Sequence, residues 1–165
     1  MKTMNPSQTG KATELRFCSL VIMGSGGLIE IVPPLADDER RDFELHLKHR
    51  FGRPLSMQVR SATRLTRRQG LKIHVRRGRR RPVDPAYWFF AAHLDLKALD
   101  FADPMFLIPS EALRRGSRLV KYVCPSLRED ARDKWVKYRV TRADLGARLL
   151  EILEKLRGRP EVSLA

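Results

Sequence analysis

The residues best suited to chemistry lie in two short runs, 42–47 and 55–60, where polar and apolar side chains alternate. A period of two residues is typical of strands that bury one face and expose the other. The connection between the runs contains Gly52, so the two strands are expected to form a hairpin. Its polar face would gather charged and amide side chains in one place.

The expected register of this hairpin brings four polar side chains together. With the turn centred near Phe51, Asp42 lies opposite Arg60, and Glu44 lies opposite Gln58. The Cβ atoms of directly opposed residues are about 4.5–5.5 Å apart, so these groups would form one cluster. A carboxylate, an amide carbonyl and a fixed cation at this spacing suit a divalent metal ion and a phosphodiester.

A helix and another strand are expected ahead of the hairpin. Asn5-Pro6-Ser7 is typical of a helix start, and Lys11–Met23 carries apolar residues at helical spacing. Gly24–Gly27 would end this helix, and Leu28–Val32 is typical of a strand that two prolines close. The helix carries Glu14.

This order of elements resembles the PD-(D/E)XK nuclease-like superfamily. Its small members often have a helix glutamate, an acidic strand and a Gln-Val-Lys-Ser type strand, and here the last of these is Met57-Gln58-Val59-Arg60-Ser61. The resemblance covers about Gly10 to Ala62. It implies an α/β (α+β) restriction-endonuclease-like core, in which helices flank a central mixed β-sheet, and a metal-dependent nuclease that acts on DNA or RNA.

The resemblance also implies a role for each matched residue. Asp42 would be the principal Mg²⁺ ligand, and Gln58 would offer its side-chain carbonyl. Glu14 would approach from the helix as a ligand, directly or through water. Arg60 stands where the family usually has a lysine that orients or activates water. Asp38, just before the acidic strand, is a reserve ligand.

Two departures from the family pattern bear on catalysis. Arg60 keeps its proton at any accessible pH, so it cannot act as a general base, although it can clamp a phosphate. Gln58 is neutral, whereas Mg²⁺ prefers charged oxygen ligands. The residues therefore also allow simpler roles: Asp42 and Arg60 as a cross-strand ion pair, and Glu14 as a solvated helix residue.

The charge balance predicts a polyanionic partner. Among 165 residues, Lys and Arg number 33 against 19 Asp and Glu, which gives a net charge of +14. Nine of the cations lie between Ser61 and Val83, a stretch without any acidic residue, and we expect them to bind nucleic-acid phosphates. They are Arg64, Arg67, Arg68, Lys72, Arg76, Arg77, Arg79, Arg80 and Arg81.

The rest of the chain predicts further strands and a final helix. Strands are expected at 71–75, at 87–94 as a strand buried on both faces, and at 105–108. Ser110 would cap a short helix, 120–123 and 135–140 are weaker strand candidates, and 145–156 is an amphipathic helix. Residues 1–158 would thus form a single domain with a C-terminal tail, 159–165.

Several other functions are disfavoured by the sequence. The glycine turn after Met23 lacks the third glycine and the following helix of a dinucleotide-binding motif. Histidines and cysteines are not at zinc-binding spacing, no base is placed to activate Cys18 or Cys124, and both cysteines are expected to be buried. No signal peptide or membrane span is visible, and two cysteines suit a reducing compartment, so a cytoplasmic protein is expected.

Three functions remain open from the sequence alone. The first is a metal-dependent nuclease, the second is a catalytically inactive nucleic-acid-binding module on the same fold, and the third is a basic domain that docks an acidic protein. The oligomeric state and the choice between DNA and RNA are not specified by these patterns.

Overall fold

The computed structural model describes residues 4–34, 41–50, 52–75, 84–115, 118–120 and 122–158. The chain forms the elements α1 (Pro6–Gly24), β1 (Ile29–Val32), β2 (Phe43–Leu47), β3 (Leu55–Ala62), β4 (Ile73–His74), β5 (Tyr87–Asp95), β6 (Asp100–Pro109), η1 (Ser110–Leu113), β7 (Arg114–Arg115), β8 (Arg118–Leu119), β9 (Tyr122–Val123), η2 (Val136–Tyr138), β10 (Arg139–Val140) and α2 (Leu145–Arg157), where η is a 3-10 helix.

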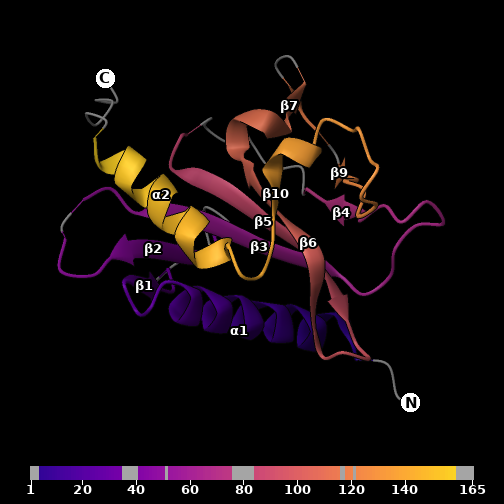
Figure 1. Ribbon diagram of the computed structural model, residues 1–165, viewed down its shortest axis with the longest axis horizontal. Coiled ribbons are helices and arrows are strands. Elements are labelled where there is room, and N and C mark those ends of the chain that lie inside the picture. Colours follow the sequence, from indigo (N-terminus) through magenta and orange to yellow (C-terminus); the bar gives the residue numbers. More distant parts are fainter. Residues whose placement is uncertain are drawn as a thin grey trace.

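A six-stranded mixed sheet organises the molecule, in the order β1-β2-β3-β5-β6-β10 (Figure 1). All neighbouring strands are antiparallel except β3 and β5, which run parallel. Parallel neighbours require a crossover connection, and here residues 63–86 leave the sheet after β3 and return to it at β5. Two short pairs, β4 with β9 and β7 with β8, lie outside the main sheet.

Both long helices pack against one face of the sheet. Apolar residues of α1 and α2, among them Phe17 and Leu149, share a buried core with the inward side chains of β2, β3 and β5. Alternation places Leu55, Met57 and Val59 of β3 in this core. We refer to this side as the helix face. Within the described ranges, no helix is both long and apolar enough to cross a membrane.

A second core covers the opposite face. It contains Phe89 and Ala91 of β5, Phe106 and Ile108 of β6, and residues such as Ile73 from the small sheet. We refer to this side as the ribbon face, after the two-stranded pair of β4 and β9 that packs on it. Since both faces of β5 are covered, its nearly continuous apolar sequence is explained and the predicted doubly buried strand is confirmed.

Most expected elements are confirmed, with differences at their ends. The predicted start of α1 is a capping box in which Asn5 and Gln8 satisfy each other's backbone N–H groups. The short helix expected after Ser110 is only a 3-10 turn that ends at Leu113. The predicted tail after Gly158 lies outside the described residues.

The two helices meet where neither has a side chain. A Cβ atom placed on Gly146 at the start of α2 would lie 2.1 Å from the carbonyl carbon of Gly24 and 2.5 Å from the amide nitrogen of Ser25. Real Cβ atoms do not approach backbone this closely, so Gly146 allows α2 to start directly against the end of α1.

An ion-pair network ties three distant segments together. Arg16 of α1 donates two hydrogen bonds of 2.7 Å to the carboxylate of Asp100, and Arg142 donates one of 2.6 Å. Asp100 opens β6 and Arg142 lies in the turn before α2. The Arg16 guanidinium is the main reason why the pKa of Asp100 falls from 3.8 to about 2.

Replacing Asp100 tests this network. We expect Asp100→Asn to lower the free energy of unfolding near neutral pH by about 2 kcal/mol, because the bidentate charge-assisted bonds are lost. The folded-state pKa is depressed, so the contribution of Asp100 is complete above about pH 4 and disappears as the pH falls toward 2. Urea unfolding of both proteins between pH 2 and 7 should show curves that converge in acid.

A control for this substitution is Asp130→Asn. Asp130 also forms a close ion pair, with Arg128, but both side chains are largely exposed. It should leave the unfolding midpoint unchanged. Equal effects of the two substitutions on the free energy of unfolding would contradict a stabilising role for the bonds from Arg16 and Arg142 to Asp100.

Candidate active site on the β2–β3 hairpin

The hairpin exists, but its register differs from the prediction by two residues. Phe43 pairs with Met57 and Glu44 pairs with Ser56, so the register is centred on residue 50 rather than on Phe51. The expected oppositions of Asp42 with Arg60 and of Glu44 with Gln58 are therefore wrong. Because the shift is an even number of residues, the same side chains still share one face.

Asp42 and Arg60 nevertheless lie together on the ribbon face. One carboxylate oxygen of Asp42 accepts a 2.6 Å hydrogen bond from the backbone N–H of Val59 and a 2.9 Å bond from Nη1 of Arg60. Nη1 also donates to the carbonyl of Val59, at 2.8 Å. The side chain of Asp42 is 15% exposed and that of Arg60 is 39% exposed. The pair is thus fixed by backbone contacts at one end and open to solvent at the other.

Gln58 lies beside this pair but is buried. Gln58 is 2% exposed, and its side-chain oxygen Oε1 accepts a 3.2 Å hydrogen bond from the hydroxyl of Tyr87. Its strand neighbour in β5 is Phe89, which belongs to the second core. A buried amide is stable only where its polar atoms have partners. Gln58 is therefore held in one orientation at the floor of the candidate site.

Glu14 is not part of this cluster. It lies on α1, which packs against the helix face, whereas Asp42, Gln58 and Arg60 belong to the ribbon face. Its carboxylate pairs with Lys11 at 3.3 Å. The residues next to Glu14 and Arg60 do meet, because the hydroxyls of Thr13 on α1 and Ser61 on β3 share a hydrogen bond. A ligand role for Glu14 would require its side chain to leave Lys11 and turn around this edge.

The donor atoms suit a hard cation in type, but they are few. Asp42 supplies a carboxylate and Gln58 an amide carbonyl, which are oxygen ligands of the kind that Mg²⁺ takes. In the described part of the chain, no three His, Cys, Asp or Glu side chains are placed to hold one metal ion. The reserve ligand Asp38 lies outside the described residues. A cation here would depend on water and substrate phosphate for its remaining ligands.

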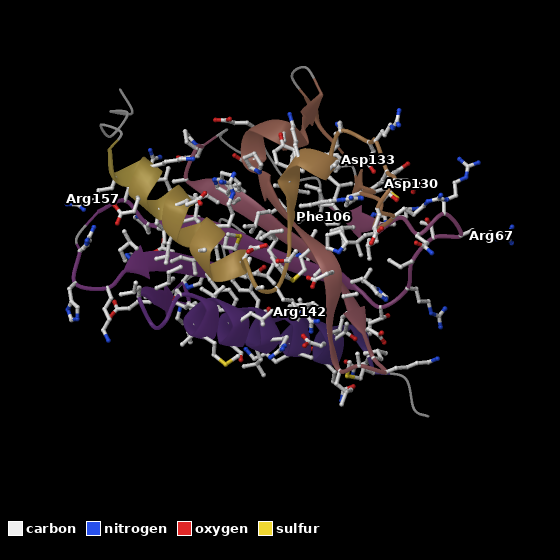
Figure 2. All side chains as sticks on the ribbon, in the orientation of Figure 1. Arg67, Phe106, Asp130, Asp133, Arg142 and Arg157 are labelled. Atoms are coloured by element: carbon white, nitrogen blue, oxygen red, sulfur yellow. The ribbon has the colours of Figure 1, made fainter. Side chains whose placement is uncertain are left out.

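The basic run is partly described. Arg64, Arg67, Arg68 and Lys72 lie on the connection after β3, and all four are exposed. Over the described ranges, none of the four forms an ion pair with a carboxylate. Arg67 projects into solvent at the end of the molecule that holds β4 and β9 (Figure 2). The other five predicted phosphate contacts, Arg76, Arg77, Arg79, Arg80 and Arg81, lie outside the described residues.

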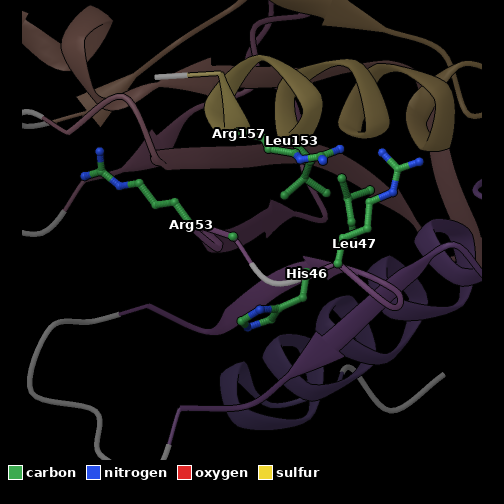
Figure 3. A pocket seen from close by; sticks show the side chains of 7 residues that line it. His46, Leu47, Arg53, Leu153 and Arg157 are labelled. Atoms are coloured by element: carbon green, nitrogen blue, oxygen red, sulfur yellow. The ribbon is translucent and has the colours of Figure 1, made fainter. Parts of the chain in front are cut away.

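A pocket at the other end of β2 is a poorer candidate site. Three arginines, His46 and Leu47 contribute to its lining, together with Leu153 of α2 (Figure 3). All three guanidinium groups are already paired, Arg53 with Asp84, and Arg50 and Arg157 with Glu154. It lies at the C-terminal end of β2, whereas Asp42 precedes the first residue of this strand. Its cations are therefore engaged in folding contacts, and the hairpin pair remains the better candidate.

Sequence reasoning missed an aromatic neighbour of the basic run. The ammonium of Lys72 lies 5.0 Å from the centroid of the Tyr122 ring, and His74 packs against the same ring. The signal was present as alternation of Lys72 and His74 with buried residues, but nothing in the sequence identified the pairing partner of this strand. Cys124, expected to be buried, is exposed beside this group.

The comparisons with known proteins support the fold. No family model and no curated protein sequence matches this chain. The structure is similar to that of a bacterial homing endonuclease, I-Ssp6803I, with a TM-score of 0.61 and 16% sequence identity. The similarity covers 93% of this chain and 95% of the other. At this level of identity it establishes the fold alone, which is an endonuclease-like mixed sheet flanked by helices.

Proposed function

We propose that this protein is a metal-dependent nuclease of the PD-(D/E)XK type, which binds nucleic acid and hydrolyses a phosphodiester bond. The observation that supports it most is the junction of Asp42, Gln58 and Arg60 on one face of the hairpin, within a nuclease-like fold. Exposed cations on the connection that follows β3 would add an electrostatic path for the substrate backbone.

Each residue has a distinct task in the proposed reaction. Asp42, held by the N–H of Val59, would bind Mg²⁺ together with the side-chain carbonyl of Gln58. The bound ion would supply Lewis acidity at the scissile phosphate and a more acidic water. Arg60 is already charged and partly exposed, so it would hold a phosphate oxygen and stabilise the negative charge that develops during attack.

A second candidate function follows from the same contact. The 2.9 Å bond between Arg60 and Asp42 neutralises the carboxylate that a cation would need. If that pair persists when substrate arrives, the protein binds nucleic acid without cutting it. Binding would then survive EDTA and fall steeply with added salt, because phosphate contacts release counterions.

The primary test combines binding and cleavage on one substrate set. Labelled single-stranded and double-stranded DNA and RNA are incubated with the protein in Mg²⁺, Mn²⁺ or EDTA, and binding is followed by fluorescence anisotropy. We expect salt-dependent binding in every condition and strand cleavage only with metal. Binding without cleavage would leave the second candidate, and no binding at physiological salt would contradict both.

Substitution of Arg60 separates the two candidates further. In the nuclease, Arg60→Lys should cleave at least as fast as wild type, because it keeps the charge and adds a group that can lose a proton. Arg60→Ala should cleave about 100-fold more slowly, as expected when a charged stabilising group is removed. Initial rates on one duplex measure both effects.

The same variants identify a purely structural pair. An exposed cross-strand ion pair is worth about 0.2–1 kcal/mol, so Arg60→Ala would then only slightly lower stability. Nucleic-acid affinity would be equal in wild type, Arg60→Lys and Arg60→Ala, with no cleavage by any of them. That pattern would remove this hairpin from consideration as an active site.

A further inference from the structure

The small sheet of β4 and β9 extends beyond the residues of these two strands. Ile73 pairs with Val123 and His74 with Tyr122, and an isolated bridge joins Gly70 to Ser126 in the same register. Backbone bonds fill the gap, from Leu71 N–H to Pro125 and from Leu127 N–H to Gln69. Residues 69–74 and 122–127 therefore form one continuous two-stranded antiparallel ribbon, which we call the β4–β9 ribbon.

The ribbon has a buried side and a solvent side. Leu71, Ile73 and Val123 point into the second core, which fixes the ribbon to the ribbon face of the sheet. The alternate residues Lys72, His74, Tyr122 and Cys124 are exposed. Tyr122 is 48% exposed, which is a large exposed fraction for an aromatic side chain.

The solvent side is surrounded by uncompensated cations. Arg67 and Arg68 lie in the turn that leads into the ribbon, and both are exposed without a carboxylate partner among the described residues. Lys72 contacts the Tyr122 ring instead of an acid. Arg60 of the candidate active site lies on the face of the sheet on which the ribbon packs.

We infer that the solvent side of the β4–β9 ribbon enters the major groove of duplex DNA and contacts base edges there. The inference rests on the proposed function and extends it to a substrate class. The major groove of B-form DNA admits a two-stranded ribbon and presents donors and acceptors to its side chains. Lys72, His74 and Tyr122 carry such groups, while the flanking arginines would bind phosphates and fix the register.

The local geometry favours duplex DNA over other nucleic acids. Stacking on single strands needs a free aromatic face, but the Lys72 ammonium lies over the ring of Tyr122 and His74 packs against it at 6.1 Å between centroids. A-form RNA duplexes have a major groove too narrow for side chains to read. The ribbon therefore suits B-form DNA.

Cys124 gives a direct probe of this contact. It is exposed on the solvent side of the ribbon, whereas Cys18 on α1 is partly buried and burial raises the pKa of its thiol. Wild-type protein is alkylated with N-ethylmaleimide, with or without excess duplex DNA in EDTA, and both cysteines are followed by mass spectrometry. We expect DNA to slow modification of Cys124 at least about tenfold and to leave Cys18 unchanged. The RNA duplex of the same sequence should protect neither.

A second experiment tests base contact itself. Replacing guanine and adenine by their 7-deaza forms removes the N7 acceptors of the major groove and leaves the phosphates intact. Wild type should bind the 7-deaza duplex about five- to tenfold more weakly than the ordinary duplex. The double variant Lys72→Gln, Tyr122→Leu should bind both equally, while the control Lys97→Gln, in the exposed turn between β5 and β6, should behave as wild type.

The outcomes separate this inference from the proposed function. Salt-dependent DNA binding with an unprotected Cys124, or with no sensitivity to 7-deaza bases in wild type, would overturn the ribbon contact alone. Equal protection by the RNA duplex would also overturn it. Absence of any nucleic-acid binding would contradict the proposed function, and this inference with it.

Discussion

Asp42→Asn is expected to lose metal-dependent cleavage by about 100-fold or more and to keep nucleic-acid binding. The substitution removes the carboxylate that Asp42 would offer to the proposed cation and keeps the size of the side chain. Asparagine still offers an oxygen to the N–H of Val59, whereas alanine would leave that N–H without its present acceptor. Cleavage rates in saturating Mn²⁺, measured beside anisotropy titrations in EDTA, give the two quantities separately.

A matched carboxylate controls for the change in charge. Glu30 on β1 is exposed and pairs in register with His46, which puts it on the ribbon face as well. Glu30→Gln alters the net charge by the same amount, and it should cleave like wild type. Thermal melts of both variants exclude unfolding as the cause, since loss of the Asp42–Arg60 pair should cost at most about 1 kcal/mol. Full cleavage by Asp42→Asn would contradict the proposed metal site.

Gly146→Ala is expected to lose more stability than alanine at any other glycine that the structure describes. The new Cβ would overlap the backbone of Gly24 and Ser25, which cannot move aside as a flexible side chain can. Separating α1 from α2 would open the first core, so a loss of about 3 kcal/mol or more is expected. For a chain of this size that corresponds to a fall of about 6–12 °C in Tm, measured by circular dichroism.

The same chemical change elsewhere should have the opposite sign. Gly10 lies in α1, and no atom is within 4 Å of the position its Cβ would take. Gly10→Ala should therefore raise stability by about 0.5–1 kcal/mol, because alanine loses less backbone freedom than glycine on entering a helix. A Gly146→Ala protein as stable as wild type would show that the helices can shift apart freely.

Local patterns were enough to predict most strands of the sheet and the β2–β3 hairpin, but not which strands pair elsewhere. Alternation identified β2 and β3, and the uninterrupted apolar run identified β5. The start of β6 at Asp100 was missed, because two acidic residues and Pro104 within that strand are typical of a turn. What makes the segment a strand is pairing with β5 and the bonds from Arg16, which are contacts between residues far apart in sequence.

The candidate site was predicted in part for the same reason. The alternation of polar and apolar residues was enough to place Asp42 and Arg60 on one face of the hairpin. This placement is correct although the predicted register was wrong by two residues. The register itself depends on the turn after Leu47, where His49 adopts a φ of 59° that its sequence does not announce. Glu14 was grouped with the hairpin from chain order, but the side of the sheet on which α1 packs is a tertiary property.

The crossover between β3 and β5 has a consequence for how such a protein can change over generations. It leaves the sheet and rejoins it at two adjacent buried strands, so its ends are anchored whatever lies between them. Among the described residues of this connection, Leu71, Ile73 and Val75 pack in the second core, whereas the exposed Lys72 and His74 do not belong to it. Mutations at these outward positions can therefore change the surface of the ribbon while the hairpin that holds Asp42 and Arg60 stays intact. If the proposed function and the ribbon contact hold, target recognition and phosphodiester cleavage can evolve separately in this chain.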